Sequence, residues 1–232
     1  MRLYLIRHAQ SANNALTTYT DRVCDPDLTE LGYRQAEALA GHLAYGVDHV
    51  PGSEPSQGYQ ITHLYCSAMY RALVTARPVS ARLDLPPRVW VDTHELGGIY
   101  LDDDSGGTVG YPGRTRSQIL HDFPHYVLPE EITETGWWRY DQRETGPAFR
   151  SRVVRVAEQL RNWADSDRSI VLISHGDFSN ALLRVLLRQP WDNGSYHYHS
   201  NTGISRIDFR TDGYLVVRYL NRVPHLTAGL LS

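Results

Sequence analysis

The sequence predicts a three-layer α/β/α sandwich with a mostly parallel sheet, an antiparallel edge strand and an inserted lid subdomain. Strand-like apolar runs alternate along the chain with amphipathic helical segments. Such alternation is typical of parallel strands joined by right-handed helical crossovers. The last two apolar runs are instead separated by a short turn with an Asp-Gly pair, which is typical of an antiparallel hairpin. The 232 residues suit one large domain over 1–232.

The strands are predicted from short runs that are rich in β-branched and aromatic residues. They are RLYLI at 2–6, ITHLYC at 61–66, RVWVD at 88–92, SIVLIS at 169–174, ISRIDF at 204–209 and YLVVRYL at 214–220. Asp212-Gly213 lies between the last two. We therefore expect the C-terminal hairpin to form an antiparallel edge of the sheet.

Four helices are predicted between these strands. Residues 28–43 place apolar side chains four apart, with Thr29 as the N-cap. Residues 67–83 begin at Ser67, a second N-cap candidate, and contain Pro78, which predicts a kink or break. The other two are 146–164, with Pro147 in the first turn, and 176–188.

Residues 97–146 interrupt this rhythm. The segment begins with a stretch rich in Gly and Asp, and short helices are expected around 115–122 and 131–140. Trp137 and Trp138 are expected to anchor it by burial. We interpret 97–146 as an insertion above the carboxyl ends of the strands, where α/β proteins bind ligands. It would act as the lid and set substrate specificity.

Composition excludes several classes of protein. The net charge of −3 gives no support for a nucleic-acid partner or an anionic membrane surface. No apolar run approaches the length of a membrane span. The N-terminus enters a strand directly, without the pattern of a secretory signal. With only Cys24 and Cys66, a disulfide framework is not expected, and the chain is predicted to be cytoplasmic.

The chain contains no lysine, so all 23 basic residues are arginine. This excludes Schiff-base chemistry and a P-loop lysine. It also favours bidentate guanidinium recognition of any bound anion.

Reactive side chains follow four of the predicted strands. Arg7 and His8 come after the first, Arg71 lies one helical turn beyond the second, and Glu95 and His175 follow the next two. The carboxyl ends of parallel strands meet at one edge of a sheet. We therefore expect these side chains to share one crevice.

These residue types suit phosphoryl transfer through a phosphohistidine. Arginines would bind the phosphate oxygens, and a neutral His8 would attack phosphorus. Arg7 and Arg71 disfavour the cationic form of His8. A carboxylic acid, Glu95, would protonate the leaving alkoxide. We expect the same arginines to keep Glu95 ionised in the empty site. This chemistry needs neither a metal nor a cofactor.

Four motifs in order resemble the histidine phosphatase superfamily, the phosphoglycerate-mutase-like proteins. They are LIRHAQSANN, DLTELGYRQAEALAGHL, SAMYRALVTA and LISHGD. The resemblance implies that His8 is the phosphorylated nucleophile, with Arg7, Arg71 and His175 around the phosphate. It implies Glu95 as the proton donor. The family usually has Gly after the histidine, where this chain has Ala9.

Three further substrate-binding candidates surround these motifs. Asn14 stands where the family places a phosphate-contacting asparagine, and Gln10 and Gly176 are the other two. His199, Asn201 and Thr202 are candidates for the rim of the crevice. Four arginines of the insertion are ordinary solvated cations or contacts for a second charged group of the substrate: Arg114, Arg116, Arg139 and Arg143.

The favoured function is a metal-independent hydrolase of small phosphomonoesters. One alternative is a 2,3-bisphosphoglycerate-dependent phosphoglycerate mutase, in which a substrate hydroxyl replaces water. That branch usually has Trp-Asn after the first motif's Ser, where this chain has Ala12-Asn13. The aspartates at 102–104 would also repel a phosphoglycerate carboxylate. A catalytically weak binding or regulatory module is a second alternative. A homodimer through an exposed sheet edge is a further expectation.

Overall fold

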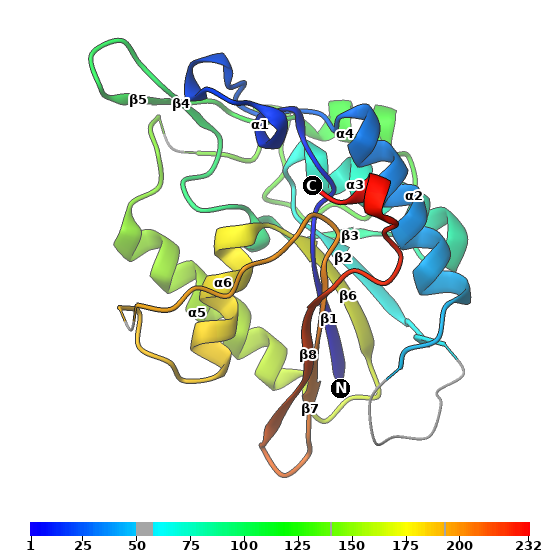
Figure 1. The fold of residues 1–232 in the computed structure, drawn as a ribbon. Helices are drawn as coiled ribbons and strands as arrows, with labels where there is room; N and C mark the ends of the chain where they lie inside the picture. Colours follow the sequence, from blue (N-terminus) through cyan, green and yellow to red (C-terminus); the bar gives the residue numbers. More distant parts are fainter. Residues whose placement is uncertain (50–57, 140, 193) are drawn as a thin grey trace.

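The computed structural model describes residues 1–49, 58–139, 141–192 and 194–232. Its main element is a six-stranded sheet in the order β3-β2-β6-β1-β7-β8 (Figure 1). The strands are β1 (Arg2–Arg7), β2 (His63–Cys66), β3 (Arg88–Val89), β6 (Ser169–Ser174), β7 (Ile204–Phe209) and β8 (Leu215–Arg222). The first four strands in the sheet order are mutually parallel, and β7 and β8 are antiparallel to their neighbours.

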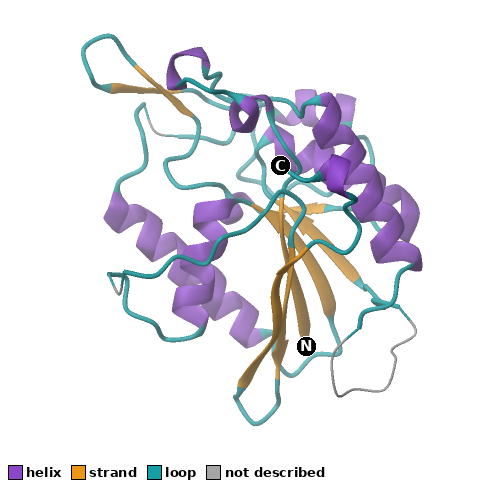
Figure 2. Cartoon of the chain, in the orientation of Figure 1, coloured by secondary structure: helices purple, strands orange, loops and turns teal. Residues whose placement is uncertain are grey.

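Helices cover both faces of the sheet, which confirms the three-layer sandwich (Figure 2). The side chains of β1 show this directly. Tyr4 and Ile6 lie in a core shared with α2 (Glu30–Tyr45) and α3 (Tyr70–Leu83). Leu3 and Leu5 lie in a second core shared with α5 (Gly146–Asn162) and α6 (Gly176–Leu186). Because both faces are covered, the central strands read as continuous apolar runs.

The short helical elements lie in the connections. They are α1 (Ala12–Ala15), η1 (Tyr19–Asp21), η2 (Val91–Thr93), α4 (Arg116–Asp122) and η3 (Ala228–Leu230). Within the described residues, the structure contains no helix that combines the length and apolar character needed to cross a membrane.

Two predicted elements differ from the structure by three residues at one end. The strand expected at 88–92 stops after Val89, and the chain turns into η2. The helix expected from 67 begins at Tyr70, with Met69 at the N-cap position. Ser67 does not cap the helix. Its hydroxyl instead forms a hydrogen bond with His175. Pro78 lies inside α3, which continues to Leu83.

The C-terminal hairpin forms the antiparallel edge of the sheet, as predicted. The predicted hairpin forms between β7 and β8, and β7 also pairs along β1, from Arg2 opposite Asp208 to Ile6 opposite Ile204. The edge strand at this side of the sheet is β8.

The 97–146 segment holds a small second sheet. β4 (Tyr100–Asp102) pairs antiparallel with β5 (Thr108–Gly110), and this hairpin projects from one corner of the molecule (Figure 1). The helix expected at 115–122 forms as α4. The helix expected at 131–140 is wrong over 131–139, which form turns; residue 140 lies outside the described residues. Gly136, with φ of +93°, closes a tight turn on Thr133 and prevents a helix there.

The two tryptophans anchor this segment. Trp137 and Trp138 are buried, and both donate backbone N–H bonds to the carbonyl of Pro112. A Cβ at Gly98 would lie 2.1 Å from the Trp138 ring. Gly98 also has φ of +75°. Glycine at this position therefore permits the ring to pack against the backbone just after Glu95.

Candidate active site

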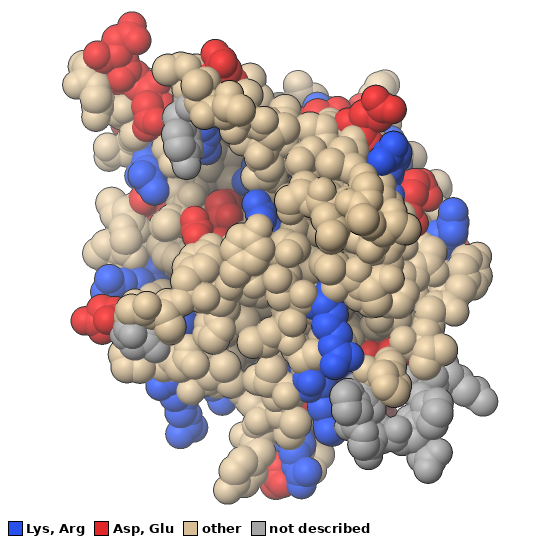
Figure 3. All heavy atoms as spheres, in the orientation of Figure 1, with Lys and Arg blue, Asp and Glu red and all other residues tan. Residues whose placement is uncertain are grey.

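A cavity of about 630 Å³ opens at the carboxyl ends of the parallel strands. Segments far apart in sequence line it, including the end of β1, the first turns of α3 and α6, and the start of the 97–146 segment. Acidic and basic side chains gather beneath the β4–β5 hairpin in the same region (Figure 3). The lining residues used below are Arg7, His8, Asn14, Arg22, Arg71, Glu95, Tyr100, Asp102, Arg143, Gly176, Asp177, Tyr196, Tyr198 and His199.

His8 is held as a neutral imidazole with its lone pair on Nε2. Arg71 Nε donates to His8 Nε2 at 3.1 Å. A guanidinium has only donors, so Nε2 accepts and Nδ1 carries the proton, which it donates to the Ala9 carbonyl at 2.7 Å. Burial lowers the pKa of His8 well below its usual range, and Arg71 and Arg7 lower it further. Both causes favour the neutral form expected for His8, and burial is the larger of the two.

The two arginines bring fixed donors to the cavity. Arg7 ends β1, and its Nη1 donates to the carbonyl of His199 at 2.8 Å. Its Nε is buried and has no hydrogen-bond partner among the described residues. Arg71 lies in the first turn of α3. A buried donor without a partner is costly unless something binds it, so Arg7 Nε is suited to an anion oxygen.

His175 lies immediately beside His8 but not on the cavity surface. The two ring centroids are 5.1 Å apart, and His175 is fully buried. Its Nε2 pairs with Ser67 Oγ at 2.8 Å, while Nδ1 has no partner within the described chain. Burial, followed by Arg71, lowers the pKa of His175 well below its usual range. Sequence reasoning missed Ser67 as its partner, because the serine resembled a helix cap.

Glu95 is held at the N-terminus of α6. Its Oε1 accepts from the backbone N–H of Leu96 and of Phe178, both at 2.9 Å, and Oε2 accepts from Asp177 N–H at 3.2 Å. Burial and the Asp177 carboxylate raise the pKa of Glu95, against the opposing effect of Arg71. Arg71 lowers this pKa, as expected of an arginine, but desolvation and Asp177 outweigh it, so the net shift is upward.

The predicted substrate-binding residues separate into two groups. Asn14 lines the cavity, and its Oδ1 accepts from Ser11 and from Asn201 Nδ2 at 3.3 Å. Its Nδ2 therefore points away from these donors. Gly176 also lines the cavity, as the first residue of α6. Gln10 does not line it, because its Oε1 accepts from Thr29 Oγ1 at 2.7 Å beneath the first turn of α2.

Two tyrosines of the cavity wall were not predicted. Tyr196 donates from its hydroxyl to Asp177 Oδ1 at 2.7 Å, and Tyr198 also lines the cavity. Of the rim candidates, His199 lines the cavity, whereas Asn201 is buried outside the lining and donates to the His8 carbonyl at 2.9 Å. The only sequence signal was the alternation of Tyr and His at 196–199, which resembled a strand face.

Two arginines of the 97–146 segment lie in different environments. Arg143 lines the cavity, with its guanidinium carbon 5.1 Å from the Tyr100 ring centroid. Arg114 instead pairs with Asp122 at 2.7 Å and stacks on Tyr70.

Comparison with known proteins decides the family. Residues 3–222 match the histidine phosphatase superfamily (branch 1). The chain belongs to this superfamily. It is a phosphatase, a phosphoric monoester hydrolase, as are the relatives named below.

Two curated relatives illustrate the similarity. The adenosylcobalamin/alpha-ribazole phosphatase of Salmonella typhimurium is 26% identical over 229 residues, which cover 95% of this chain and 96% of the relative. The glucosyl-3-phosphoglycerate phosphatase of Mycolicibacterium vanbaalenii is 30% identical over 204 residues, which cover 83% of this chain and 76% of the relative.

Solved structures show the same fold. A putative alpha-ribazole-5′-P phosphatase from Escherichia coli superposes with a TM-score of 0.64 at 23% identity, covering 96% of this chain and 97% of its own. The phosphoserine phosphatase of Entamoeba histolytica, in complex with 3-phosphoglyceric acid, gives 0.62 at 20% identity, covering 97% and 99%.

Ala9, where histidine phosphatases usually have glycine, is fully buried and has no left-handed backbone. Its N–H donates to Thr75 Oγ1 at 3.1 Å. The conformation therefore does not require glycine.

We expect Ala9→Gly to lower the free energy of unfolding by about 1 kcal/mol, through added chain entropy and a lost methyl contact. Urea unfolding measures this. We expect kcat/KM to change by less than about twofold. A tenfold gain in kcat/KM would instead show that the methyl group impedes the site.

Burial of neutral histidines predicts acid sensitivity. Burial lowers the pKa of eight histidines: His8, His42, His63, His94, His175, His197, His199 and His225. For His199 and His225 it falls to about 4. Each histidine takes up a proton on unfolding below its unfolded pKa of about 6.5. Its contribution to stability is present above that pH and is lost as the pH falls. Burial raises the pKa of Asp25, to about 6, and of Glu95, which oppose this loss in part.

We therefore expect the free energy of unfolding to fall between pH 6.5 and 5, by about 1.4 kcal/mol per pH unit for each proton of difference. Urea titrations at several pH values measure it. His225 lies outside the cavity lining and suits a test of this dependence. Because it contributes one titratable group, His225→Asn should reduce the slope of unfolding free energy against pH by the equivalent of at most one proton. Stability that rises as the pH falls over this range would contradict the assignment.

Proposed function

We propose that this chain hydrolyses small phosphomonoesters through a phosphohistidine on His8, with Glu95 as the proton donor. The observation that carries the proposal is the Arg71 Nε to His8 Nε2 hydrogen bond at 3.1 Å. It leaves the Nε2 lone pair directed toward a guanidinium, which is where a phosphate group would bind. A neutral, buried imidazole beside bound phosphate is a competent nucleophile.

In the first step the phosphate meets the donors of Arg7, Arg71 and Asn14, with His175 beside His8. Arg71 Nε transfers its hydrogen bond from His8 Nε2 to a phosphate oxygen, which frees the lone pair. The Nε2 lone pair then forms a bond to phosphorus, and the bond from phosphorus to the ester oxygen breaks. Glu95 gives its proton to that oxygen, which leaves as an alcohol. The raised pKa of Glu95 favours the protonated form that this step needs.

In the second step the Glu95 carboxylate takes a proton from water while the water oxygen bonds to phosphorus. The bond from phosphorus to Nε2 breaks, and its electron pair returns to the ring. Inorganic phosphate leaves, and both His8 and Glu95 regain their starting states. The arginines balance the phosphoryl charge throughout. This scheme requires no metal or redox cofactor.

Hydrolysis is favoured over the mutase reaction by the named relatives, which are phosphatases. The aspartates at 102–104 repel a phosphoglycerate carboxylate less than the sequence suggested. Asp102 lines the cavity, but Asp103 accepts bonds from Ser105 and Gly107 within the hairpin turn. Of these three aspartates, only Asp102 lines the cavity.

The substrate is proposed to be a small phosphorylated metabolite. The relatives are named for alpha-ribazole, glucosyl-3-phosphoglycerate and phosphoserine substrates. At the outer end of the cavity, Arg22 and Arg143 lie over the Tyr100 ring, at 5.8 and 5.1 Å from its centroid. This arrangement suits a substrate with a second polar or anionic group.

The test is phosphate release from a panel of phosphomonoesters with chelator present. Metal-independent release from at least one ester is the expected result. Release that depends on added metal would reject the scheme. Transfer between phosphoglycerates, in an assay primed with 2,3-bisphosphoglycerate and without phosphate release, would identify a mutase instead.

A further inference from the structure

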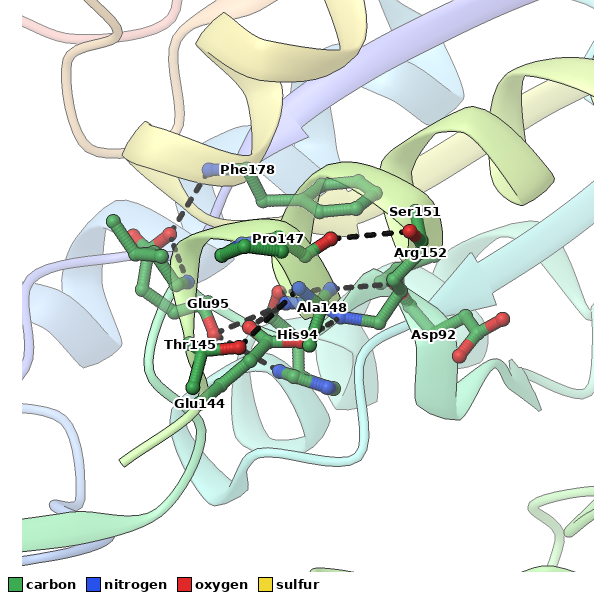
Figure 4. Close-up of polar contacts among 12 residues, drawn as sticks. Asp92, His94, Glu95, Glu144, Thr145, Pro147, Ala148, Ser151, Arg152 and Phe178 are labelled. Carbon is green, nitrogen blue, oxygen red and sulfur yellow. Dashed lines mark hydrogen bonds and ion pairs between the residues drawn. The ribbon is translucent and has the colours of Figure 1, made fainter. Parts of the chain in front are cut away.

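A buried ion pair lies directly behind the loop that carries Glu95. Arg152, on α5, donates from Nε to Glu144 Oε1 at 2.9 Å and from Nη2 to Glu144 Oε2 at 2.7 Å (Figure 4). Both side chains are almost fully buried, with exposures of 4% and 3%. Neither residue lines the cavity. Burying two charges costs free energy. Direct contact with substrate does not account for the burial of this pair.

Arg152 uses its remaining donors on the backbone before and at Glu95. Nη1 donates to the carbonyls of Asp92 at 2.7 Å and His94 at 2.9 Å. Nη2 makes a longer bond, at 3.5 Å, to the carbonyl of Glu95 itself. All five N–H groups of the guanidinium are thereby engaged, two on Glu144 and three on the segment 92–95.

Glu144 holds the same loop on the other side of Glu95. Its backbone N–H donates to the carbonyl of Gly97 at 3.0 Å. The Arg152 guanidinium carbon also lies 5.6 Å from the centroid of the Phe178 ring. The backbone N–H of Phe178 binds Glu95 Oε1. The ion pair thus contacts the chain before and after Glu95, and the residue that holds its carboxyl group.

We propose that Arg152 and Glu144 are positioning residues that hold segment 92–97 so that the Glu95 carboxyl reaches the leaving oxygen. This inference rests on the proposed role of Glu95 as proton donor. The fork geometry is essential to it, because lysine keeps the charge but carries three donors on one nitrogen and cannot span Glu144 and three carbonyls. Proton transfer is sensitive to displacement of the donor, whereas attack by His8 is not governed by this loop.

The test compares two esters in Arg152→Lys and in the isosteric variant Glu144→Gln. Alkyl phosphates need a protonated leaving group, and nitrophenyl phosphate hardly does. We expect kcat/KM to fall by about 30- to 100-fold for the alkyl ester and less than about threefold for nitrophenyl phosphate. Binding of inorganic phosphate should stay within about threefold, since the anion donors are untouched.

The matched control is Arg155→Met. Arg155 lies on the same helix and binds the Asp92 carboxylate at 3.2 Å, but its side chain is 58% exposed. We expect it to leave both esters unchanged. Equal losses on both esters in the Arg152 and Glu144 variants, or no loss in either, would overturn the positioning role. Thermal unfolding of each variant checks that the comparison is made on folded protein.

Glu95→Gln, measured in parallel, separates the positioning role of Arg152 and Glu144 from the proton-donor role of Glu95. If it shows the leaving-group dependence and the Arg152 and Glu144 variants do not, the positioning role fails and the proposed chemistry stands. If Glu95→Gln itself lacks that dependence, the proton-donor role fails.

Discussion

The His8→Ala variant is expected to lose at least about 10⁴-fold in kcat/KM on every phosphomonoester, because no other group takes the place of a covalent nucleophile. Arg71 holds the Nε2 lone pair of His8 at the cavity. Phosphate release from the ester panel measures the effect. The loss should not depend on the leaving group, since the bond to phosphorus cannot form with any ester.

Phosphate binding separates the nucleophile from a structural role. Arg7, Arg71 and Asn14 remain in the variant, so we expect the Kd for inorganic phosphate to rise by no more than about tenfold. His121→Ala is the matched control, because the His121 side chain is 86% exposed. Turnover by His8→Ala within tenfold of the unsubstituted protein would remove His8 from the nucleophile position.

The Glu95→Gln variant is expected to slow alkyl phosphates by about 10²- to 10⁴-fold, and nitrophenyl phosphate by less than about tenfold. An amide keeps an acceptor for the N–H groups of Leu96 and Phe178 but has no proton to give. Steady-state kinetics on a series of esters with different leaving groups measures the dependence. A uniform loss along the series would argue against a proton donor.

Asp177→Asn is the informative neighbour for this experiment. The Asp177 carboxylate raises the pKa of Glu95, so its removal lowers that pKa. Glu95 then loses its proton at a lower pH, and the basic limb of the pH profile for alkyl esters should move to lower pH. A basic limb that stays in place would mean that another group sets it.

The central part of the site could be predicted because parallel strands bring their carboxyl ends together. Arg7, Arg71 and Glu95 are distant in sequence, yet each follows a strand or begins the next helix, and all line one cavity. The family resemblance rests on the same segments. For these residues, the order of the strands and the type of side chain were sufficient to predict that they share one site.

Other features depend on contacts that no local pattern encodes. Ser67 resembled a helix cap, and its bond to His175 joins residues 108 positions apart. The pKa of Glu95 depends on desolvation, which the sequence does not give. Gln10 stands two residues from His8, but its side chain is directed to Thr29 by the packing of α2.

The 97–146 segment was the least predictable region. Its composition marked it as an insertion, but the 131–139 turns depend on Gly136 and on the packing of Trp137 and Trp138. The pairing of Glu144 with Arg152 was also missed. Its contacts with the Asp92 and His94 carbonyls form only where the loop before β4 lies against α5 (Figure 4).

The most direct test of the account is to quench turnover rapidly in alkali, where phosphohistidine is stable, and to map the phosphoryl group by peptide mass spectrometry. The account predicts a phosphoryl group on the peptide that contains His8, formed and consumed at least as fast as kcat. Full turnover with no phosphorylated His8 at any quench time, or with the group on another residue, would contradict it.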